Sequence, residues 1–236
     1  ADTLRVSQDT CPITGSGSSY YPDQDALGLL YPVVFGRPGG GGALFWDGTA
    51  INVPATPALL AEYGNGRAAY RLSKLIIAGH RVSATSVIVH DRSGGYSRFS
   101  PDFLRQSLTV YHTTDRLGQT VAYVSGADTD AANAGIRLVP GNDYQVEWPN
   151  GGGITNERGV VLRQAGDIVA YLLARSGVPV DEGGSARALT ELNRFTLDFC
   201  LTEQIDPVSW VDSVLGDLLG FVVLAGPNGL IVVRHR

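Results

Sequence analysis

The C-terminal segment from Gly166 to Arg236 constrains the fold most strongly, because start and stop signals mark each of its expected helices and strands. Asp167 is a suitable side-chain cap for a helix over residues 168–175, and Gly177 stands where a glycine commonly ends a helix. Ser185 is a suitable cap for a second helix, whose apolar residues recur at core spacing. Local chemistry thus predicts two helices in the first half of this segment.

The second half of the segment predicts a third helix and a terminal hairpin. Asp206 followed by Pro207 is typical of a helix start. The N–H groups of the first helical turn have no partner within the helix, so the missing N–H of proline costs nothing there. Apolar residues then repeat at helical spacing over 208–219. Two apolar runs flank the turn at 226–229, which predicts a β-hairpin. A short strand is expected over 197–201.

The part of the chain before residue 160 has a different pattern, in which short strand-forming runs alternate with turns rich in Gly, Pro, Asn and Asp. Such spacing is typical of a β-barrel or a β-sandwich. The predicted fold class is therefore α+β, with a β-rich barrel or sandwich N-terminal part and a helix-containing α+β C-terminal part. The clearest predicted strands of the first part span residues 29–36, 70–77, 82–90, 108–113, 120–124 and 143–148.

The glycine-rich stretch Pro149–Gly153 separates these two patterns. Clusters of glycine and proline commonly interrupt secondary structure. We therefore predict a β-rich domain over residues 1–150 and an α+β domain, with three helices and a C-terminal hairpin, over 151–236. The alternative, that the stretch is only a surface loop, is open at this point.

The charge balance excludes some classes of function. The chain of 236 residues has a formal net charge of −5, which argues against a nucleic-acid-binding surface. Lys74 is the only lysine, and a bias toward arginine suits protein interfaces, although a GC-rich genome would produce the same bias. No apolar run has the length of a membrane span. Cys11 and Cys200 define no disulfide framework, so a pair and two buried thiols are both open.

Two loops have partial resemblance to ligand-binding motifs. Residues 36–42 are rich in glycine, but they lack the Lys-Ser/Thr of a phosphate loop, and Pro38 removes one of the amides that would bind phosphate. Asp128–Asp130 resembles the start of a calcium loop, but Asn133 replaces the required glycine and Val139 the required glutamate. The sequence therefore predicts no cofactor-binding and no metal-binding residues.

The histidines and aromatic residues have a structural and a functional interpretation. His90 with Asp91 could orient a nearby serine, but the strand–turn–helix motif of a serine nucleophile is missing, so no catalytic residue is predicted and the chain is expected not to be an enzyme. The aromatic residues could form a sugar-binding platform, although core and interface packing is more common. The histidines are His80, His90, His112 and His235, the serines are Ser93, Ser97 and Ser100, and the aromatic residues are Trp46, Trp148, Trp210, Tyr20, Tyr21, Tyr96 and Tyr111.

Three stretches of the chain share a pattern with a known family. They are Leu30–Arg37 with Ile51–Pro57, Ala165–Asp181, and Asp206–Leu219 with Gly226–Leu230. Together they resemble the baseplate-hub (tail-tip) proteins of long-tailed bacteriophages (siphoviruses) and of related gene-transfer particles. The resemblance implies β-barrel domains with a helical insertion, arranged as a homotrimer that closes the tail tube, and no catalytic residues.

On this resemblance the chain is expected to be a structural virion protein of the tail, assembled in the host bacterial cytoplasm. Its expected partners are further copies of itself and neighbouring distal-tail, fibre or spike proteins. An acidic balance would suit a tube lumen through which DNA passes during ejection, because like charges repel. Two alternatives are a receptor- or carbohydrate-binding module of the tail and a cell-wall hydrolase domain.

Overall fold

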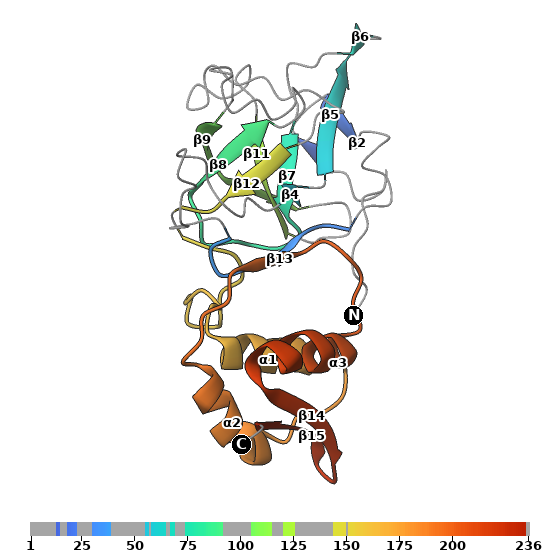
Figure 1. Ribbon diagram of the computed structural model, residues 1–236. Helices are drawn as coiled ribbons and strands as arrows, with labels where there is room; N and C mark the ends of the chain where they lie inside the picture. The colour runs from blue at the N-terminus through green and yellow to red at the C-terminus, as the bar shows by residue number, and fades with distance from the viewer. Residues whose placement is uncertain are drawn as a thin grey trace. The chain divides into compact units, whose positions relative to one another are not determined.

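The computed structural model describes eleven stretches of the chain, drawn as ribbons in Figure 1. The chain divides into two compact units. We call the described residues up to Val161 together with Phe199–Thr202 the β unit, and Leu162–Asp198 together with Glu203–Arg236 the α+β unit. The described residues are 13–14, 18–22, 30–38, 55–56, 58–64, 67–68, 74–91, 105–114, 120–125, 144–149 and 151–234.

This division confirms the predicted α+β class, since small antiparallel sheets make up the first part of the chain and three helical segments with strands make up the second. The main chain passes between the units after Val161, after Asp198 and after Thr202. A division by mutual contacts does not by itself define independently folding domains, so the predicted domain limits at residue 150 stay a prediction.

The β unit contains a seven-stranded sheet and a four-stranded sheet, both antiparallel in every described pairing. The first sheet has the order β1 (Ile13–Thr14), β2 (Ser18–Pro22), β5 (Ala58–Gly64), β7 (Lys74–Ala78), β11 (Thr120–Ser125), β10 (Tyr111–Thr114), with β6 (Arg67–Ala68) paired to β5. The second has the order β4 (Ala55–Thr56), β12 (Tyr144–Glu147), β8 (Ser86–Asp91), β9 (Arg105–Thr109).

One hydrophobic core serves both sheets. Leu75 and Ile77 enter it from β7, where Ile76 is buried as well. Val87 and Val89 enter it from β8, where buried and half-buried residues alternate as expected of a strand that has one buried face. Trp148, which follows β12, is 1% exposed and is the largest fully buried side chain among the described residues. Two sheets around a shared core are the arrangement that a barrel and a sandwich have in common.

The glycine-rich stretch before Thr155 is a packed crossing rather than a surface loop. Strand β3 (Val33–Phe35) pairs on one side with β13 (Phe199–Leu201). On its other side Ile154 N–H donates to Val34 O and Gly153 N–H donates to Gly36 O, both at 2.9 Å. Gly152 and Gly153 are buried, so these two residues do not belong to a surface loop. Side chains at these positions would prevent the two backbones from meeting.

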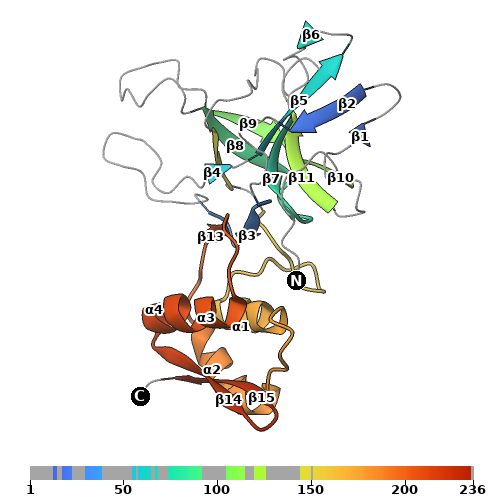
Figure 2. The ribbon, with the colours of Figure 1, turned by 90° about the vertical axis from the view of Figure 1, so that its right-hand side faces the viewer.

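The α+β unit consists of three helical segments and a hairpin. Figure 2 shows α1 and α3 side by side, with the hairpin forming a separate layer of this unit. Its core combines Ile168 and Leu172 of α1 with Leu192 of α2, Leu215 of the third helical segment and Phe221 of the hairpin. The elements are α1 (Ala165–Ala174), α2 (Glu182–Leu192), the continuous α3 (Pro207–Trp210), η5 (Val211–Gly216) and α4 (Asp217–Leu219), then β14 (Phe221–Gly226) and β15 (Gly229–Arg234).

The third helix and the hairpin confirm the predictions made from local chemistry. Asp206 accepts a hydrogen bond from Ser209 N–H at 2.8 Å and caps α3, with Pro207 in the first turn. Gly220, at φ 71°, ends the helix in the left-handed conformation that glycine adopts without strain. Strands β14 and β15 pair in register around the predicted turn.

The predicted caps of the first two helices are wrong. Helix α1 starts at Ala165, ahead of Asp167, whose carboxylate instead accepts a hydrogen bond from the amide of Asn193 at 3.0 Å. Helix α2 starts at Glu182 and is capped by Asp181, which leaves Ser185 buried inside the helix. In both cases the side chain that a local rule assigned to the helix end instead bonds to a residue far away in the chain: Asp167 to Asn193, and Ser185 to Val232.

Candidate interaction surface

The described histidines have structural roles. His80 Nε2 accepts a hydrogen bond from Val34 N–H at 3.0 Å, and His112 Nε2 accepts one from Val82 N–H at 3.2 Å. Asp91 ends β8, but the side chains of His90 and Asp91 lie outside the described residues, as do His235 and the three candidate serines. The arrangement that the sequence raised for a serine nucleophile therefore stays untested.

The glycine loop that begins at Gly36 is part of the packed β unit where it is described. Gly36 and Pro38 are buried, and Trp148 N–H donates to the Pro38 carbonyl at 3.0 Å. Residues 39–42 lie outside the described residues, and so does the whole 126–143 segment with its candidate calcium loop. Within the described ranges no three His, Cys, Asp or Glu side chains come together as metal ligands.

Cys200 lies on β13 and packs against the core of the β unit. Burial raises the pKa of its thiol to about 12, so the thiol stays protonated at neutral pH and is a poor nucleophile. Cys200 is a free cysteine in the structure, and Cys11 lies outside the described residues.

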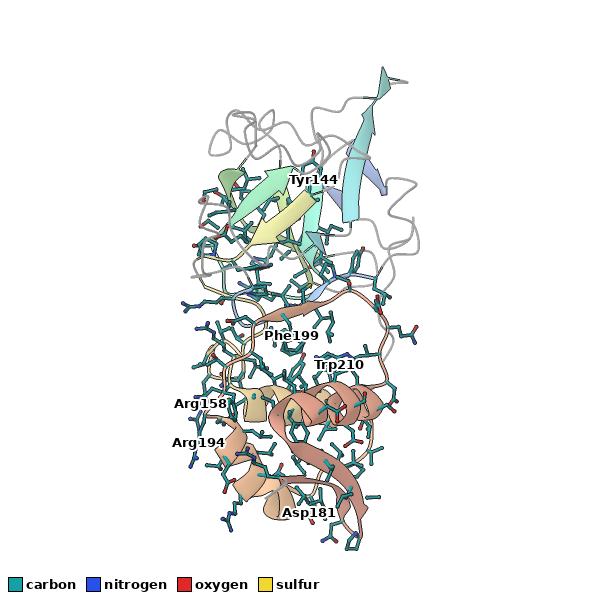
Figure 3. The ribbon with its side chains drawn as sticks, in the orientation of Figure 1. Tyr144, Arg158, Asp181, Arg194, Phe199 and Trp210 are labelled. Carbon is teal, nitrogen blue, oxygen red and sulfur yellow. The ribbon has the colours of Figure 1, made fainter. Side chains whose placement is uncertain are left out.

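The candidate aromatic platform is divided among different environments. Trp148 belongs to the core. Tyr111 forms a tilted cross-strand pair with Tyr123, with ring centroids 5.8 Å apart. Trp210 lies half-buried on α3 (Figure 3). The side chains of Trp46, Tyr20, Tyr21 and Tyr96 lie outside the described residues.

The hairpin has an apolar face that no described segment buries fully. Side chains alternate between the two faces of a strand, and Phe221, Leu230 and Val232 occupy the buried face. The opposite face carries only apolar side chains, and we call it the hairpin face. Leu224 is 50% exposed and Val233 is 40% exposed. The hairpin face consists of the cross-strand pairs Val222–Val233 and Leu224–Ile231.

The chain itself occupies the outer edge of β15. Leu230 N–H donates to Pro179 O at 2.8 Å, and Asp181 N–H donates to Leu230 O at 2.9 Å, so the segment before α2 forms one parallel bridge to the hairpin (Figure 3). Further along, Val232 N–H donates to the Ser185 hydroxyl at 3.1 Å. An unpaired strand edge is a template for another strand, and these contacts remove that template from β15.

One amide on the outer edge of β14 is bound by a carboxylate. Val223 N–H donates to Asp212 Oδ1 at 2.7 Å. Asp212 belongs to η5, where the helix widens to the π form, and Gly216 of the same turn packs against the carbonyl of Phe221. Because groups of the chain are bound at both edges of the hairpin, we expect a partner protein to contact the hairpin face rather than the edges.

Replacement of Asp212 by alanine is expected to lower the free energy of unfolding by about 1.5–3 kcal/mol, the usual cost of losing a hydrogen bond to a charged group. The freed edge of β14 should also promote self-association. Denaturant unfolding and sedimentation velocity measure the two effects. Asp212→Asn keeps an acceptor oxygen and should lose less stability, whereas Asp217→Ala removes an exposed acid of α4 and should change little. Equal losses in all three variants would contradict the role of Asp212.

A second exposed apolar pair lies on the third helical segment. Val214 is 45% exposed and Leu218, four residues later, is 67% exposed, while Val211 and Leu215 are buried. Single apolar side chains on a surface need no explanation, whereas the paired apolar residues of the hairpin face are typical of a binding surface. Among described residues, the exposed large hydrophobic side chains of the α+β unit are Val178, Phe195, Val214, Leu218, Leu224 and Val233.

Several arginines of this unit are engaged within the chain. Arg163 binds Asp198 through two nitrogen–oxygen contacts of 2.8 and 2.6 Å. Arg234 lies 3.8 Å from Glu191, which also pairs with Arg187 at 3.1 Å. These arginines therefore serve the unit's own structure, and its apolar side chains are the stronger candidates for an interface.

Comparisons of the chain with protein-family models, with curated proteins and with solved structures find no match. None of the described helices combines the length and the apolar character needed to cross a membrane.

Proposed function

We propose that the chain is a structural component of a bacteriophage tail tip: a baseplate-hub or hub-adjacent ring protein that closes the distal tail tube and anchors fibres or a spike. The observation that carries the proposal is the hairpin face, an uncharged surface on a hairpin whose two edges are engaged within the chain. The three stretches that resemble hub proteins supply the biological context.

The proposed assembly is a homotrimer that also contacts distal-tail, fibre or spike proteins. In a ring, each copy presents one surface to the next copy and a different surface to the previous one. An apolar patch without charged side chains can be covered at such a contact without desolvating ions, which is costly. The hairpin face has this composition, which supports its use as a contact between proteins.

The copy number of the chain in purified source particles tests the proposal. Quantitative mass spectrometry against the major tail-tube protein is expected to give about three copies per particle, the number of subunits in a trimer, with peptides confined to tail fractions. Absence of the chain from particles would remove the structural proposal. Saturable glycan binding or bond cleavage by the purified chain would then favour one of the two alternatives.

A further inference from the structure

The segment between β7 and β8, residues 79–85, is a junction of the β unit. Gly79 N–H donates to Pro32 O at 2.9 Å, and Ser83 N–H donates to Gly152 O at 3.0 Å. Thr85 O accepts a hydrogen bond from Val110 N–H at 2.9 Å. The segment thus connects β3, the glycine crossing and the link between β9 and β10. In two further hydrogen bonds of this junction, the acceptor is an imidazole nitrogen, of His80 in one and of His112 in the other.

His80 binds β3 in a form that requires a neutral ring. Its Nε2 accepts the N–H of Val34, which lies 46 residues earlier, at 3.0 Å. Its Nδ1 lies 2.9 Å from the carbonyl of Arg81 and is the nitrogen that carries the hydrogen, because a carbonyl can only accept. Protonation of Nε2 would place one N–H against another. The Val34 amide would then lose its acceptor.

His112 binds the same junction from the other side. Its Nε2 accepts Val82 N–H at 3.2 Å, again a contact that only the unprotonated nitrogen makes. The charged group acting on it is the guanidinium of Arg81. On the neighbouring strands, Ala122 of β11 is its cross-strand partner and Ala78 of β7 lies opposite Ala122, and neither titrates. Burial, and then Arg81, lower the pKa of His112 below its ordinary value of 6.5.

The hydrogen bond between His80 and Val34 matters for the fold because β3 also pairs with β13. Val34 donates to His80 and accepts from Ile154 N–H, so its amide and carbonyl are both bound on the side away from β13. On the other side β3 holds β13, including a stacked contact between the Phe35 and Phe199 rings with centroids 4.9 Å apart. The titratable side chain behind this pairing is Cys200, whose thiol stays neutral because burial raises its pKa.

We propose that His80 and His112 form an acid-sensitive latch, which holds residues 79–85 against β3 and β10 at neutral pH. Each ring releases its own amide, Val34 or Val82, when it takes up a proton, and the latch is open when both rings are protonated. This inference is independent of the proposed tail function. Opening would weaken the attachment of β3 and would loosen β13, the strand at which the chain returns from the α+β unit. The latch uses no metal and no ligand, because both acceptors and both donors belong to the chain.

The direction of the pH effect follows from proton binding. The closed form requires neutral rings, while histidines in an opened segment titrate near 6.5. The open form therefore binds more protons below this pH, and each imidazole makes opening about tenfold more favourable per pH unit. The closed form is fully favoured above pH 6.5 and loses that advantage as the pH falls.

Amide hydrogen exchange of the full chain, resolved at Val34 and Val82, tests the latch between pH 7.5 and 4.5. After correction for the intrinsic pH dependence of exchange, protection of both amides should fall about tenfold per pH unit below 6.5. The amide of Leu172 in α1, which is distant in the chain and belongs to the α+β unit, should keep its protection. Unchanged protection at Val34 and Val82 would overturn the proposal.

The double variant His80→Gln, His112→Gln keeps an acceptor oxygen at each position but does not titrate. Its Val34 and Val82 amides should be protected equally at pH 7.5 and pH 5, and a wild-type pH dependence in this variant would also overturn the latch. Where the double variant fails to fold, the single variant His112→Gln tests the latch. It should remove the pH dependence at Val82 while Val34 keeps its own, and an unchanged response at Val82 would count against the proposal.

Discussion

Replacement of Gly153 by alanine is expected to lower the free energy of unfolding by at least about 3 kcal/mol, within the range known for overpacked or clashing buried positions. A Cβ at this position would overlap the carbonyl oxygen and carbon of Val34. Neither group is a flexible side chain that could turn away. The substitution therefore has to move a backbone or break the crossing.

The backbone of β3 cannot easily shift away from a new side chain at residue 153, because it is hydrogen-bonded or paired on both sides. Val34 is held by His80 and Ile154 on one side and pairs with Cys200 of β13 on the other. Gly152, next in the crossing, accepts hydrogen bonds from Ser83. A shift of β3 would break several of these bonds at once, and each buried polar group that loses its partner costs about 1–3 kcal/mol.

Gly183→Ala is the matched control for this glycine. Its new Cβ would lie 3.6 Å from Asp181 Oδ1, an ordinary contact, inside helix α2. Alanine favours a helix over glycine by about 0.5–1 kcal/mol, so this variant should be slightly more stable than the wild type. Urea unfolding followed by tryptophan fluorescence compares the two, because Trp148 belongs to the β unit and Trp210 to the α+β unit. Equal stability of Gly153→Ala and the wild type would contradict the packed crossing.

Local signals predicted those elements whose ends depend on nearby residues. The cap at Asp206, the end of the helical repeat at residue 219 and the turn at 226–229 depend on a few neighbouring residues, and the structure has all three where expected. Asp167 and Ser185 follow the same rules of composition, yet bind Asn193 and Val232 instead. A local rule gives no information on partners 26 or 47 residues away.

The glycine crossing could not be recognised from the sequence for a related reason. Glycine permits both a flexible loop and a close approach of two backbones, and the composition of Pro149–Gly153 is the same in either case. The partners that distinguish them are Val34 and Gly36, more than a hundred residues earlier in the chain. Only the folded arrangement identifies Gly152 and Gly153 as buried.

The hairpin face was also beyond sequence analysis. Residues 221–224 and 230–233 are apolar without interruption, so no alternation of polar and apolar residues marks the outward side. The strands themselves were predicted from their turn. Which face is exposed depends on the packing of Phe221, Leu230 and Val232 against the helices, a property of the whole unit.

Replacing the apolar surface side chains Leu218 and Leu224 together, as Leu218→Gln and Leu224→Thr, is expected to reduce incorporation of the chain into source particles by at least about tenfold. Truncation of a hot-spot side chain at the centre of an interface costs about 2 kcal/mol or more. In a trimer every copy carries the change, so the loss is repeated at each contact. Glutamine suits a helix and threonine suits a strand, so the fold itself should persist.

Val160→Thr is the matched control, because Val160 is 59% exposed but belongs to the β unit. Both variants should unfold within about 0.5 kcal/mol of the wild type, as expected for exposed positions. Incorporation is measured by mass spectrometry of particles assembled with each variant as the only copy of the chain. Wild-type incorporation of the double variant would exclude these side chains from the interface. An equal loss with Val160→Thr would point to a general surface effect. A loss confined to the double variant, with stability unchanged, would locate the assembly contact on the α+β unit.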